Sequence, residues 1–320
     1  MKTALICGVS GQDGAYLSKL LLDKGYQVYG GSRDAQSSNF ENLNRLGVLE
    51  LVKLVSISVH DFRSVLQVIM KVKPDEIYNL AGQSSVALSF EQPVETLESI
   101  SVGTLSLLEA IRFSGLPIKL YNAGSSECFG NAIEAVDENT AFRPRSPYGV
   151  AKATAFWEVA NYREAYKIFA CTGILFNHES PLRKERFVTK KIIAAACRIA
   201  KGSNERLVLG NINIWRDWGW APEYVEAMWL MLQQSEPEDF VIATGETISL
   251  KDFIIIAFEY LNLDWTKYVS FDDSLFRPTD IEKGLANPQK ANNKLKWKAK
   301  IKSRNLIELL IDSELNSKYL

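Results

Sequence analysis

Short apolar runs alternate with longer stretches of helical periodicity through the first half of the chain. The apolar runs are rich in β-branched and aromatic residues and predict strands over residues 3–7, 27–31, 51–56, 76–80, 119–123 and 169–175. Between them, apolar positions spaced along one helix face predict helices over residues 16–24, 62–72, 94–114 and 147–166. This alternation is typical of a parallel sheet with crossover helices. We therefore expect an α/β fold with a doubly wound, Rossmann-like parallel sheet.

The rhythm loosens after residue 176, where a basic, polar stretch over residues 183–186 precedes helical patterns over 189–201 and 223–234. No repeat, low-complexity segment or flexible linker separates the two halves. This pattern favours a smaller carboxyl-terminal lobe packed onto the sheet. We expect a dinucleotide-binding domain of residues 1–176 plus about 213–248, and a discontinuous substrate-binding lobe of about 177–212 plus 249–320.

Composition excludes several classes of function. The 320 residues are 47% hydrophobic and 23% charged, which is ordinary for a globular protein. Thirty-seven basic residues against 38 acidic ones leave no excess charge for nucleic acid or an anionic membrane. The amino terminus runs straight into a strand-like segment, and no apolar run is long enough to span a bilayer. We therefore expect a cytoplasmic protein with no nucleic-acid or membrane partner.

The cysteines and histidines predict no metal site. Two histidines, His60 and His178, have no second histidine or cysteine pair nearby to complete a zinc set. The cysteines are scattered with neither metal-ligand nor disulfide-framework spacing, at Cys7, Cys128, Cys171 and Cys197. We expect them to be reduced.

A glycine-rich segment follows the first predicted strand and opens the first helix. It reads Gly-Val-Ser-Gly-Gln-Asp-Gly over residues 8–14, with glycine at its first, fourth and seventh positions. Glycines there let the backbone approach a pyrophosphate, and the helix terminus supplies donors and positive potential. The alternative is a turn whose glycines serve packing alone. The candidate cofactor-binding residues are Gly8, Ser10, Gly11, Gln12, Asp13 and Gly14.

The end of the second predicted strand bears on the choice between NADP and NAD. Arg33, with Ser32 beside it, suits a ribose phosphate, whereas Asp34 suits unphosphorylated ribose hydroxyls. Two solvated loop charges are the third interpretation. The sequence favours NADP and leaves NAD open.

Four residues in two phrases have the character of a catalytic set. Tyr148 and Lys152 are four apart on one helix face, so the ammonium can favour phenolate and let Tyr148 take a hydroxyl proton as hydride leaves. Ser125 and Glu127 follow the fifth strand and project to the same side if the extended conformation persists. A carboxylate there can take a proton from carbon and return one to a departing hydroxide, which is the chemistry of a dehydratase.

Small residues end the fourth predicted strand, in Asn-Leu-Ala-Gly-Gln-Ser-Ser over residues 79–85. Backbone there can border a cofactor while side-chain hydroxyls and amides reach a substrate; a simple polar loop is the alternative. Leu80, Ala81 and Gln83 are candidates for cofactor contact, and Ser84 and Ser85 for substrate contact.

With these motifs in this order, the chain resembles the extended short-chain dehydrogenase/reductase family and, within it, the GDP-mannose 4,6-dehydratases. The likeness runs nearly from end to end. The most specific phrases are Phe-Asn-His-Glu-Ser-Pro over residues 176–181, Phe-Val-Thr over 187–189, Arg-Asp-Trp-Gly over 216–219 and Tyr-Val-Glu-Ala-Met-Trp over 224–229. The resemblance implies a homodimer or homotetramer that converts GDP-mannose to GDP-4-keto-6-deoxy-mannose by internal hydride transfer.

The resemblance also implies roles for residues. Ser125 stands where the family usually has threonine, and Glu127, Tyr148 and Lys152 match its other catalytic residues. Besides the glycine segment and Arg33, the implied cofactor contacts are Asp61, Leu80, Ala81, Gln83, Tyr148, Lys152, Asn177 and His178. The implied substrate contacts are Ser84, Ser85, Asn177, Thr189, Lys191, Asn211, Arg216, Arg277 and Asp280.

Several positions have bland alternatives or depart from the family pattern. Arg216 could simply pair with Asp217 or stack on a tryptophan, and Asn177 could only form a turn. Residues 32–38 lack the family's usual pair of arginines, which puts cofactor preference and tetramer formation in doubt. Ser58 replaces an expected adenine-contacting aspartate, and Asp280 is one methylene shorter than the usual glutamate.

Rival functions remain on the same scaffold. A nucleotide-sugar 4-reductase or epimerase does not need Glu127, and a decarboxylase needs a cation for a uronic carboxylate. A more distant alternative is a protein that binds the cofactor without catalysis, against which the intact Tyr148, Lys152 and Glu127 argue.

Overall fold

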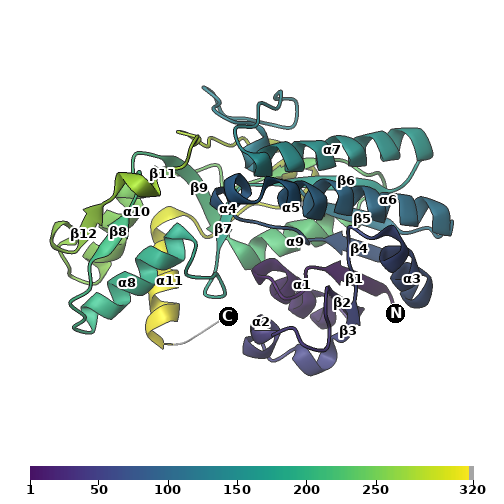
Figure 1. Cartoon of the computed structure of the whole chain (residues 1–320), viewed down its shortest axis with the longest axis horizontal. Helices are drawn as coiled ribbons and strands as arrows, with labels where there is room; N and C mark the ends of the chain where they lie inside the picture. Colours follow the sequence, from purple (N-terminus) through teal and green to yellow (C-terminus); the bar gives the residue numbers. More distant parts are fainter. Residues whose placement is uncertain (317–320) are drawn as a thin grey trace.

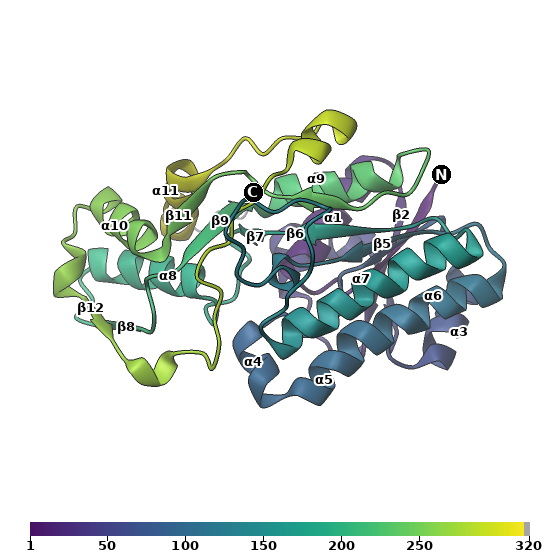
Figure 2. The same cartoon turned by 90° about the horizontal axis from the view of Figure 1, so that it is seen from above.

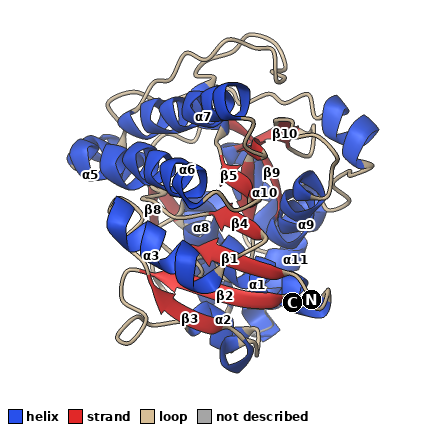
Figure 3. Ribbon diagram, turned by 90° about the vertical axis from the view of Figure 1, so that its right-hand side faces the viewer, coloured by secondary structure: helices blue, strands red, loops and turns tan. Residues whose placement is uncertain are grey.

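A parallel sheet organises the larger part of the molecule. The computed structural model describes residues 1–316, in which seven strands are ordered β10-β6-β5-β4-β1-β2-β3 (Figures 1 and 3). Every neighbouring pair in this sheet is parallel. The strands are β1 (Thr3–Cys7), β2 (Gln27–Ser32), β3 (Lys53–Ser56), β4 (Glu76–Asn79), β5 (Lys119–Ala123), β6 (Ala170–Leu175) and β10 (Phe240–Ile242). The expected doubly wound sheet is confirmed.

Helices cover both faces of this sheet (Figure 3). On one face lie α3 (Phe62–Val72), α6 (Gly103–Ser114) and α7 (Pro147–Tyr166), and on the other α1 (Gln12–Asp23), α2 (Glu41–Arg45) and α9 (Ala221–Leu232). Each layer buries a separate apolar cluster against the strands. Because both faces are covered, the strands β4, β6 and β10 are buried along their whole length.

Helix α6 does not begin where the sequence predicts. The helical periodicity from residue 94 to 114 is divided into α5 (Pro93–Leu97), a π-helical segment (Glu98–Val102) and α6. A π-helical turn contains about one residue more than an α-helical turn. A search for the 3.6-residue spacing of apolar positions does not detect this change. Before α5 the chain forms a short helix, α4 (Val86–Glu91), that the sequence analysis did not predict.

A second, smaller body is built mainly from the last third of the chain (Figure 2). Its apolar core is formed by α8 (Val188–Ala200), α10 (Leu250–Tyr260), α11 (Ser303–Asn316) and two short strands, β8 (Leu207–Leu209) and β12 (Val269–Phe271). Between this core and the large sheet lies a three-stranded sheet in the order β11-β9-β7. Its strands are β7 (Asn177–Glu179), β9 (Trp215–Trp220) and β11 (Thr247–Ser249). The expected division into two discontinuous domains stays a proposal.

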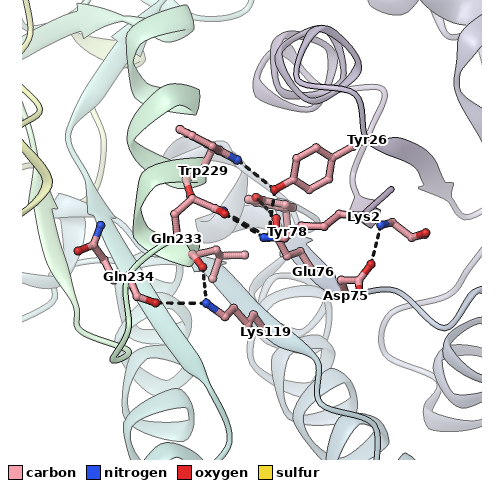
Figure 4. A network of polar contacts seen from close by, with 11 residues as sticks. Lys2, Tyr26, Asp75, Glu76, Tyr78, Lys119, Trp229, Gln233 and Gln234 are labelled. Carbon is pink, nitrogen blue, oxygen red and sulfur yellow. Dashed lines mark hydrogen bonds and ion pairs between the residues drawn. The ribbon is translucent and has the colours of Figure 1, made fainter.

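The amino ends of the large sheet are tied together by one buried carboxylate. Glu76, at the start of β4, accepts hydrogen bonds from Lys2 Nζ at 2.9 Å, from Tyr26 at 3.2 Å and from Tyr78 at 2.7 Å (Figure 4). Gln233, just after α9, donates to the same carboxylate at 3.2 Å. This network stabilises the end of the sheet opposite the strand ends where ligands of such sheets bind.

Within residues 1–316, no helix combines the length and the apolar character that crossing a bilayer requires.

Candidate functional site

A cleft of about 390 Å³ opens at the carboxyl ends of β4, β5 and β6, between the large sheet and the smaller body. The carboxyl ends of parallel strands meet at one edge of a sheet, so the polar side chains that follow β4, β5 and β6 come together there. The predicted site residues that line it are Asp13, Leu80, Ala81, Gln83, Ser84, Ser85, Ser125, Glu127, Tyr148, Lys152, Asn177, His178, Thr189, Lys191, Arg216 and Arg277. The cleft thus brings together predicted residues that lie up to 264 positions apart in the sequence, from Asp13 to Arg277.

Other predicted site residues lie outside this cleft lining. Arg33 is exposed at the end of β2, and exposed Asp61 caps the amino terminus of α3 by accepting from the Arg63 amide. Asn211 uses its side-chain oxygen to accept from the Asn213 amide at 2.8 Å. Asp280 lies behind two cleft arginines. Of the remaining members of the glycine segment, Gly8, Ser10 and Gly11 lie in the turn between β1 and α1, and Gln12 and Gly14 lie in the first turn of α1.

The glycine segment has the close backbone packing that dinucleotide binding requires. Gly8 has a φ of +87°, and a Cβ there would meet the Leu80 carbonyl oxygen at 2.7 Å. A Cβ at Gly14 would meet the Gly8 carbonyl oxygen at 2.6 Å. Helix α1 begins directly after Gly11, so the free amides of its first turn are available to an anion beside this segment. The segment therefore fits the pyrophosphate of a nicotinamide dinucleotide.

Ser125 and Glu127 reach the cleft by a different route from the one expected. The extended conformation ends at Ser125, and residues Ser126–Cys128 form one turn of 3-10 helix. The Ser125 hydroxyl caps this turn by accepting from the Glu127 amide at 3.2 Å. The prediction of an extended Ser-x-Glu was therefore wrong, since the serine's capping hydrogen bond favours the turn. Both side chains nevertheless line the cleft.

Tyr148 and Lys152 lie in the first two turns of α7. Ser146 starts this helix by accepting from the Gly149 amide at 3.0 Å, and Pro147 occupies the first helical position, where its missing N–H costs nothing. Lys152 is buried and donates to the Ala123 carbonyl oxygen at 2.6 Å. Local capping signals thus place both side chains under the cleft.

The protonation of this pair is governed by burial. Burial lowers the pKa of Lys152 to about 8, and burial raises the pKa of Tyr148, although a hydrogen bond with Ser125 partly offsets it. The Lys152 Nζ atom lies 5.8 Å from the centre of the Tyr148 ring and bonds to backbone instead of the phenol. The expectation that the ammonium favours phenolate directly is therefore not met by this geometry.

Glu127 faces two cations. Burial raises the pKa of its carboxyl group, while the positive charges of Arg216 and Arg277 lower it. The net direction is upward, so Glu127 holds a proton more readily than an ordinary glutamate. A carboxyl group tuned in this way is suited both to accept a proton from carbon and to donate one to a leaving group.

Arg216 does not pair with its neighbour Asp217. Successive strand residues point to opposite faces, so in β9 the Arg216 side chain faces the cleft and the Asp217 side chain faces away. Asp217 accepts from the backbone amides of residues 244–246, and Arg216 donates to Asp280 at 3.0 Å. The bland interpretation of an Arg216–Asp217 pair was wrong.

Asp13, in α1, and His178, in β7, contact each other in the lining of the cleft. Asp13 Oδ2 lies 2.9 Å from His178 Nε2, and the other ring nitrogen lies 2.7 Å from the Phe176 carbonyl oxygen. Although burial lowers the pKa of His178, the Asp13 carboxylate outweighs it, so the net shift is upward. The Asp13 pKa is lowered: burial raises it, but the charge of His178 and hydrogen bonds prevail. Both ring nitrogens face acceptors, which fits a charged imidazolium.

Gln83 serves the loop that borders the cleft. Its amide nitrogen donates to the Ser85 carbonyl oxygen at 2.7 Å and to Thr96 at 3.3 Å, and its amide oxygen accepts from the Ser85 backbone. Its side chain is therefore committed to holding Ser84 and Ser85 in place. Any cofactor contact from this residue has to come from its backbone.

Thr189 presents a buried hydroxyl that lacks a partner. The residue is 1% exposed, and no hydrogen bond to its Oγ1 atom is formed within residues 1–316. Because a buried polar atom without a partner is costly, the hydroxyl points to a ligand in the cleft that it lines.

The sequence analysis missed several cleft residues. Arg183 and Arg186, noted only as part of a basic stretch, line the cleft together with Leu275. Arg183 forms an ion pair with buried Glu179 at 3.2 Å and lies 3.7 Å from the Phe187 ring centre. The signal that could have found them is their position between two specific phrases, at residues 176–181 and 187–189.

Comparisons with known proteins agree with this geometry. The family model described as GDP-mannose 4,6 dehydratase matches residues 5–310. GDP-mannose 4,6 dehydratase 1 of Arabidopsis thaliana is 46% identical, over 98% of this chain and 90% of its own length. GDP-mannose 4,6-dehydratase of Vibrio cholerae is 42% identical, over 98% of this chain and 94% of its own.

Solved structures with the same fold are more distant in sequence. A UDP-glucose 4-epimerase of Thermotoga maritima superposes with a TM-score of 0.87 at 21% identity, covering 98% of this chain and 99% of its own. A dTDP-glucose 4,6-dehydratase of Streptomyces venezuelae, with NAD and TYD bound, gives a TM-score of 0.86 at 18% identity. The match covers 97% of this chain and 96% of the other. At these identities the likeness establishes the fold.

Proposed function

The chain belongs to the GDP-mannose 4,6-dehydratase family, and from this premise we propose how its cleft converts GDP-mannose to GDP-4-keto-6-deoxy-mannose and water. The observation that carries the proposal is the position of Glu127 in one cleft with Ser125, Tyr148 and Lys152. A plain reductase or 4-epimerase needs a tyrosine and a lysine but not this carboxylate. A hydro-lyase needs it for two proton transfers.

The proton transfers divide among these residues as follows. Tyr148, as phenolate, takes the proton of the sugar's C4 hydroxyl and becomes neutral, Ser125 donates a hydrogen bond near C4, and Lys152 supplies a nearby positive charge. The glycine segment would hold a nicotinamide dinucleotide, which would supply reversible hydride transfer from C4 to C6 and would not be consumed. Glu127 takes the C5 proton, made acidic by the C4 ketone, and passes it to the C6 hydroxide, which leaves as water. C5 regains a proton from solvent through Glu127, and Tyr148 releases its own proton to solvent.

The residues present fit a nicotinamide dinucleotide. A side chain at Gly8 or Gly14 would collide with neighbouring backbone, so only glycine permits the close packing of the segment that leads into α1. Leu80, Ala81 and Tyr148 extend the same wall towards the catalytic residues. We assign the pyrophosphate to the glycine segment and NADP as the preferred form, with Arg33 on the ribose phosphate.

The nucleotide-sugar is assigned to the side of the cleft formed by the smaller body. Arg216 and Arg277 supply cations for the diphosphate, and Thr189 supplies a buried hydroxyl without a protein partner. Lys191 lies in the same wall, although its ammonium donates to the Val208 carbonyl oxygen at 2.7 Å.

A homo-oligomer is the assembly that we propose. Exposed apolar side chains on neighbouring helices of one face include Leu97 on α5, Val102 just before α6, Leu105 on α6, and Val150 and Trp157 on α7. Trp157 is 62% exposed. Clustered exposed apolar side chains of this kind are typical of protein interfaces.

The test of the activity is the change Glu127→Gln. Wild-type protein with GDP-mannose and catalytic NADP should release one water per sugar, seen by mass spectrometry, without net reduced cofactor. E127Q should lose turnover by a hundred- to ten-thousand-fold, because one side chain performs both proton transfers, and should bind NADP as the wild type does. The exposed Glu134 offers a control, since E134Q should turn over normally.

Turnover of E127Q close to that of the wild type would refute the assignment. Net reduction of NADP, an epimerised sugar or loss of carbon dioxide would favour the rival enzymes on this scaffold. Binding of NADP with no turnover of any nucleotide-sugar would favour a non-catalytic protein.

A further inference from the structure

We propose that Asp280 is a positioning residue, which holds Arg216 and Arg277 together as one preassembled receptor for the substrate's diphosphate. This inference deepens the proposed function and rests on it. It assigns Asp280 an action through the two arginines in place of a direct contact with the sugar or ribose. The argument rests on how one carboxylate oxygen is shared.

A single oxygen of Asp280 accepts three hydrogen bonds. Its Oδ1 atom lies 3.0 Å from Arg216 Nη2, 3.2 Å from Arg277 Nη1 and 2.9 Å from the backbone nitrogen of Ile281. Both arginines line the cleft, whereas Asp280 does not. The carboxylate is therefore behind the guanidinium groups as seen from a ligand.

The two arginines need this support to different degrees. Arg216 is 7% exposed, belongs to β9 and also donates to the Trp215 carbonyl oxygen at 2.9 Å. Arg277 lies in an irregular segment after β12, and Asp280 is its ion-pair partner within residues 1–316. Arg216 thus holds the Asp280 carboxylate in position, and this carboxylate in turn holds Arg277.

Neighbouring contacts anchor that segment to the connection between β5 and α7 and to β9. The Thr279 hydroxyl donates to the Arg145 carbonyl oxygen, and the Glu282 amide donates to the Asn131 side chain at 2.8 Å. Trp215 and Glu282 are joined by a backbone hydrogen bond of 2.8 Å. The backbone at residue 280 is consequently held, so the position of its carboxylate is decided by a side chain of only one methylene.

Electrostatics explain why a carboxylate is needed here. Two guanidinium groups brought to one oxygen repel each other, and a shared anion between them offsets this repulsion. Each guanidinium has five N–H donors, so sharing one of them with Asp280 leaves others for phosphate oxygens. A pair that is ordered before binding loses less conformational freedom on binding, which strengthens the complex.

The experiment measures binding of GDP by itself, by titration calorimetry, in the full chain. Asp280→Asn keeps the shape and removes the charge, and it should weaken GDP binding about tenfold and raise KM for GDP-mannose similarly, with kcat at saturation within about threefold. Asp280→Glu keeps the charge and should bind GDP within about threefold of the wild type. Asp273→Asn, an exposed change in the same segment, should have no effect.

A double-mutant cycle separates positioning from a merely structural role. D280N should weaken GDP binding about tenfold in the wild type and only about threefold in an Arg277→Ala background, because Asp280 then positions Arg216 alone. Equal costs in both backgrounds, or D280N binding GDP as the wild type does, would overturn the positioning role. If the wild type itself fails to bind GDP while binding NADP, the proposed function fails instead.

Discussion

At the residue scale, the proposed preference for NADP rests on two neighbouring charges after β2. Asp34 accepts from the backbone amides of Gln36 at 2.9 Å and Ser37 at 3.0 Å, and from the Ser37 hydroxyl. These hydrogen bonds, led by that of the Ser37 hydroxyl, lower the pKa of its carboxyl group. Asp34 is thus committed to its own loop, while the Arg33 side chain is 80% exposed with Glu95 3.8 Å away. The arginine, not the aspartate, is available to a ribose substituent.

Changing Arg33→Ala should therefore weaken NADP binding by about tenfold to a hundredfold, the value of a charge-assisted contact with phosphate. NAD binding should change by less than about twofold, since it has no phosphate at that position. Fluorescence titration with both reduced cofactors measures this, with the exposed Lys71→Ala as a control for net charge. An equal loss for both cofactors would contradict the assignment of Arg33.

At the element scale, α7 serves two purposes along its length. Its first turns present Tyr148 and Lys152 to the cleft, and its middle packs against α6. In that middle, Glu158 has a buried side-chain oxygen, Oε2, with no hydrogen-bond partner within residues 1–316. Burial raises the pKa of Glu158 to about 7. The helix thus includes an acid that is costly to ionise.

This cost gives a pH-dependent prediction for Glu158→Gln. The folded pKa of about 7 lies above the ordinary value of 4.5, so between these values the folded protein holds more protons than the unfolded chain. Stability conferred by the neutral acid is full below pH 4.5 and is lost as pH rises through 7. E158Q should raise the free energy of unfolding by about 1–2 kcal/mol at pH 8, a value reduced for solvent screening, and by little at pH 4.5.

Urea unfolding at both pH values measures this difference. The exposed Glu164→Gln on the same helix is the matched control and should show no such pH dependence. A gain of equal size at both pH values would show that ionisation of Glu158 is not the cause.

At the scale of the whole molecule, we expect the apolar face of α5, α6 and α7 to form the interface of the proposed homo-oligomer. Light scattering after gel filtration should give the wild type a mass of at least two chains of 36.0 kDa. Trp157→Glu places a charge at a 62% exposed apolar side chain on that face and should reduce the mass to one chain. Leu51→Glu, at a 61% exposed apolar residue elsewhere, should leave the mass unchanged. A W157E protein that stays assembled would place the interface on another face.

The candidate catalytic pair lies on a helix that also belongs to the proposed interface. Tyr148 and Lys152 belong to the same helix as Val150 and Trp157. An interface along α7 would brace the helix that presents the pair. The W157E protein should be assayed with the same water-release measurement, so that mass and turnover are compared on one sample.

The sequence by itself predicted six of the seven strands of the sheet, most of the helices that cover it and the candidate catalytic set, whereas the three-residue β10 was missed. The bounds expected for β1, β5, α3 and α7 agree with the structure, because alternation, helical periodicity and capping residues are local properties. In the smaller body, α10 was missed although Ser249 and Asp252 form a capping box at its start. The strands β8 and β12, three residues each, are too short to show a period.

Tertiary structure alone decided what several site residues do. Arg216 meets Asp280, 64 positions away, and not its neighbour Asp217, because strand geometry sends adjacent side chains to opposite faces. Burial, which depends on everything packed around a group, set the protonation of Tyr148, Lys152 and Glu127. Motifs identified which groups meet in the cleft, since strand order brings their ends together. Their partners and charges required the packed fold, because these depend on contacts between distant parts of the chain.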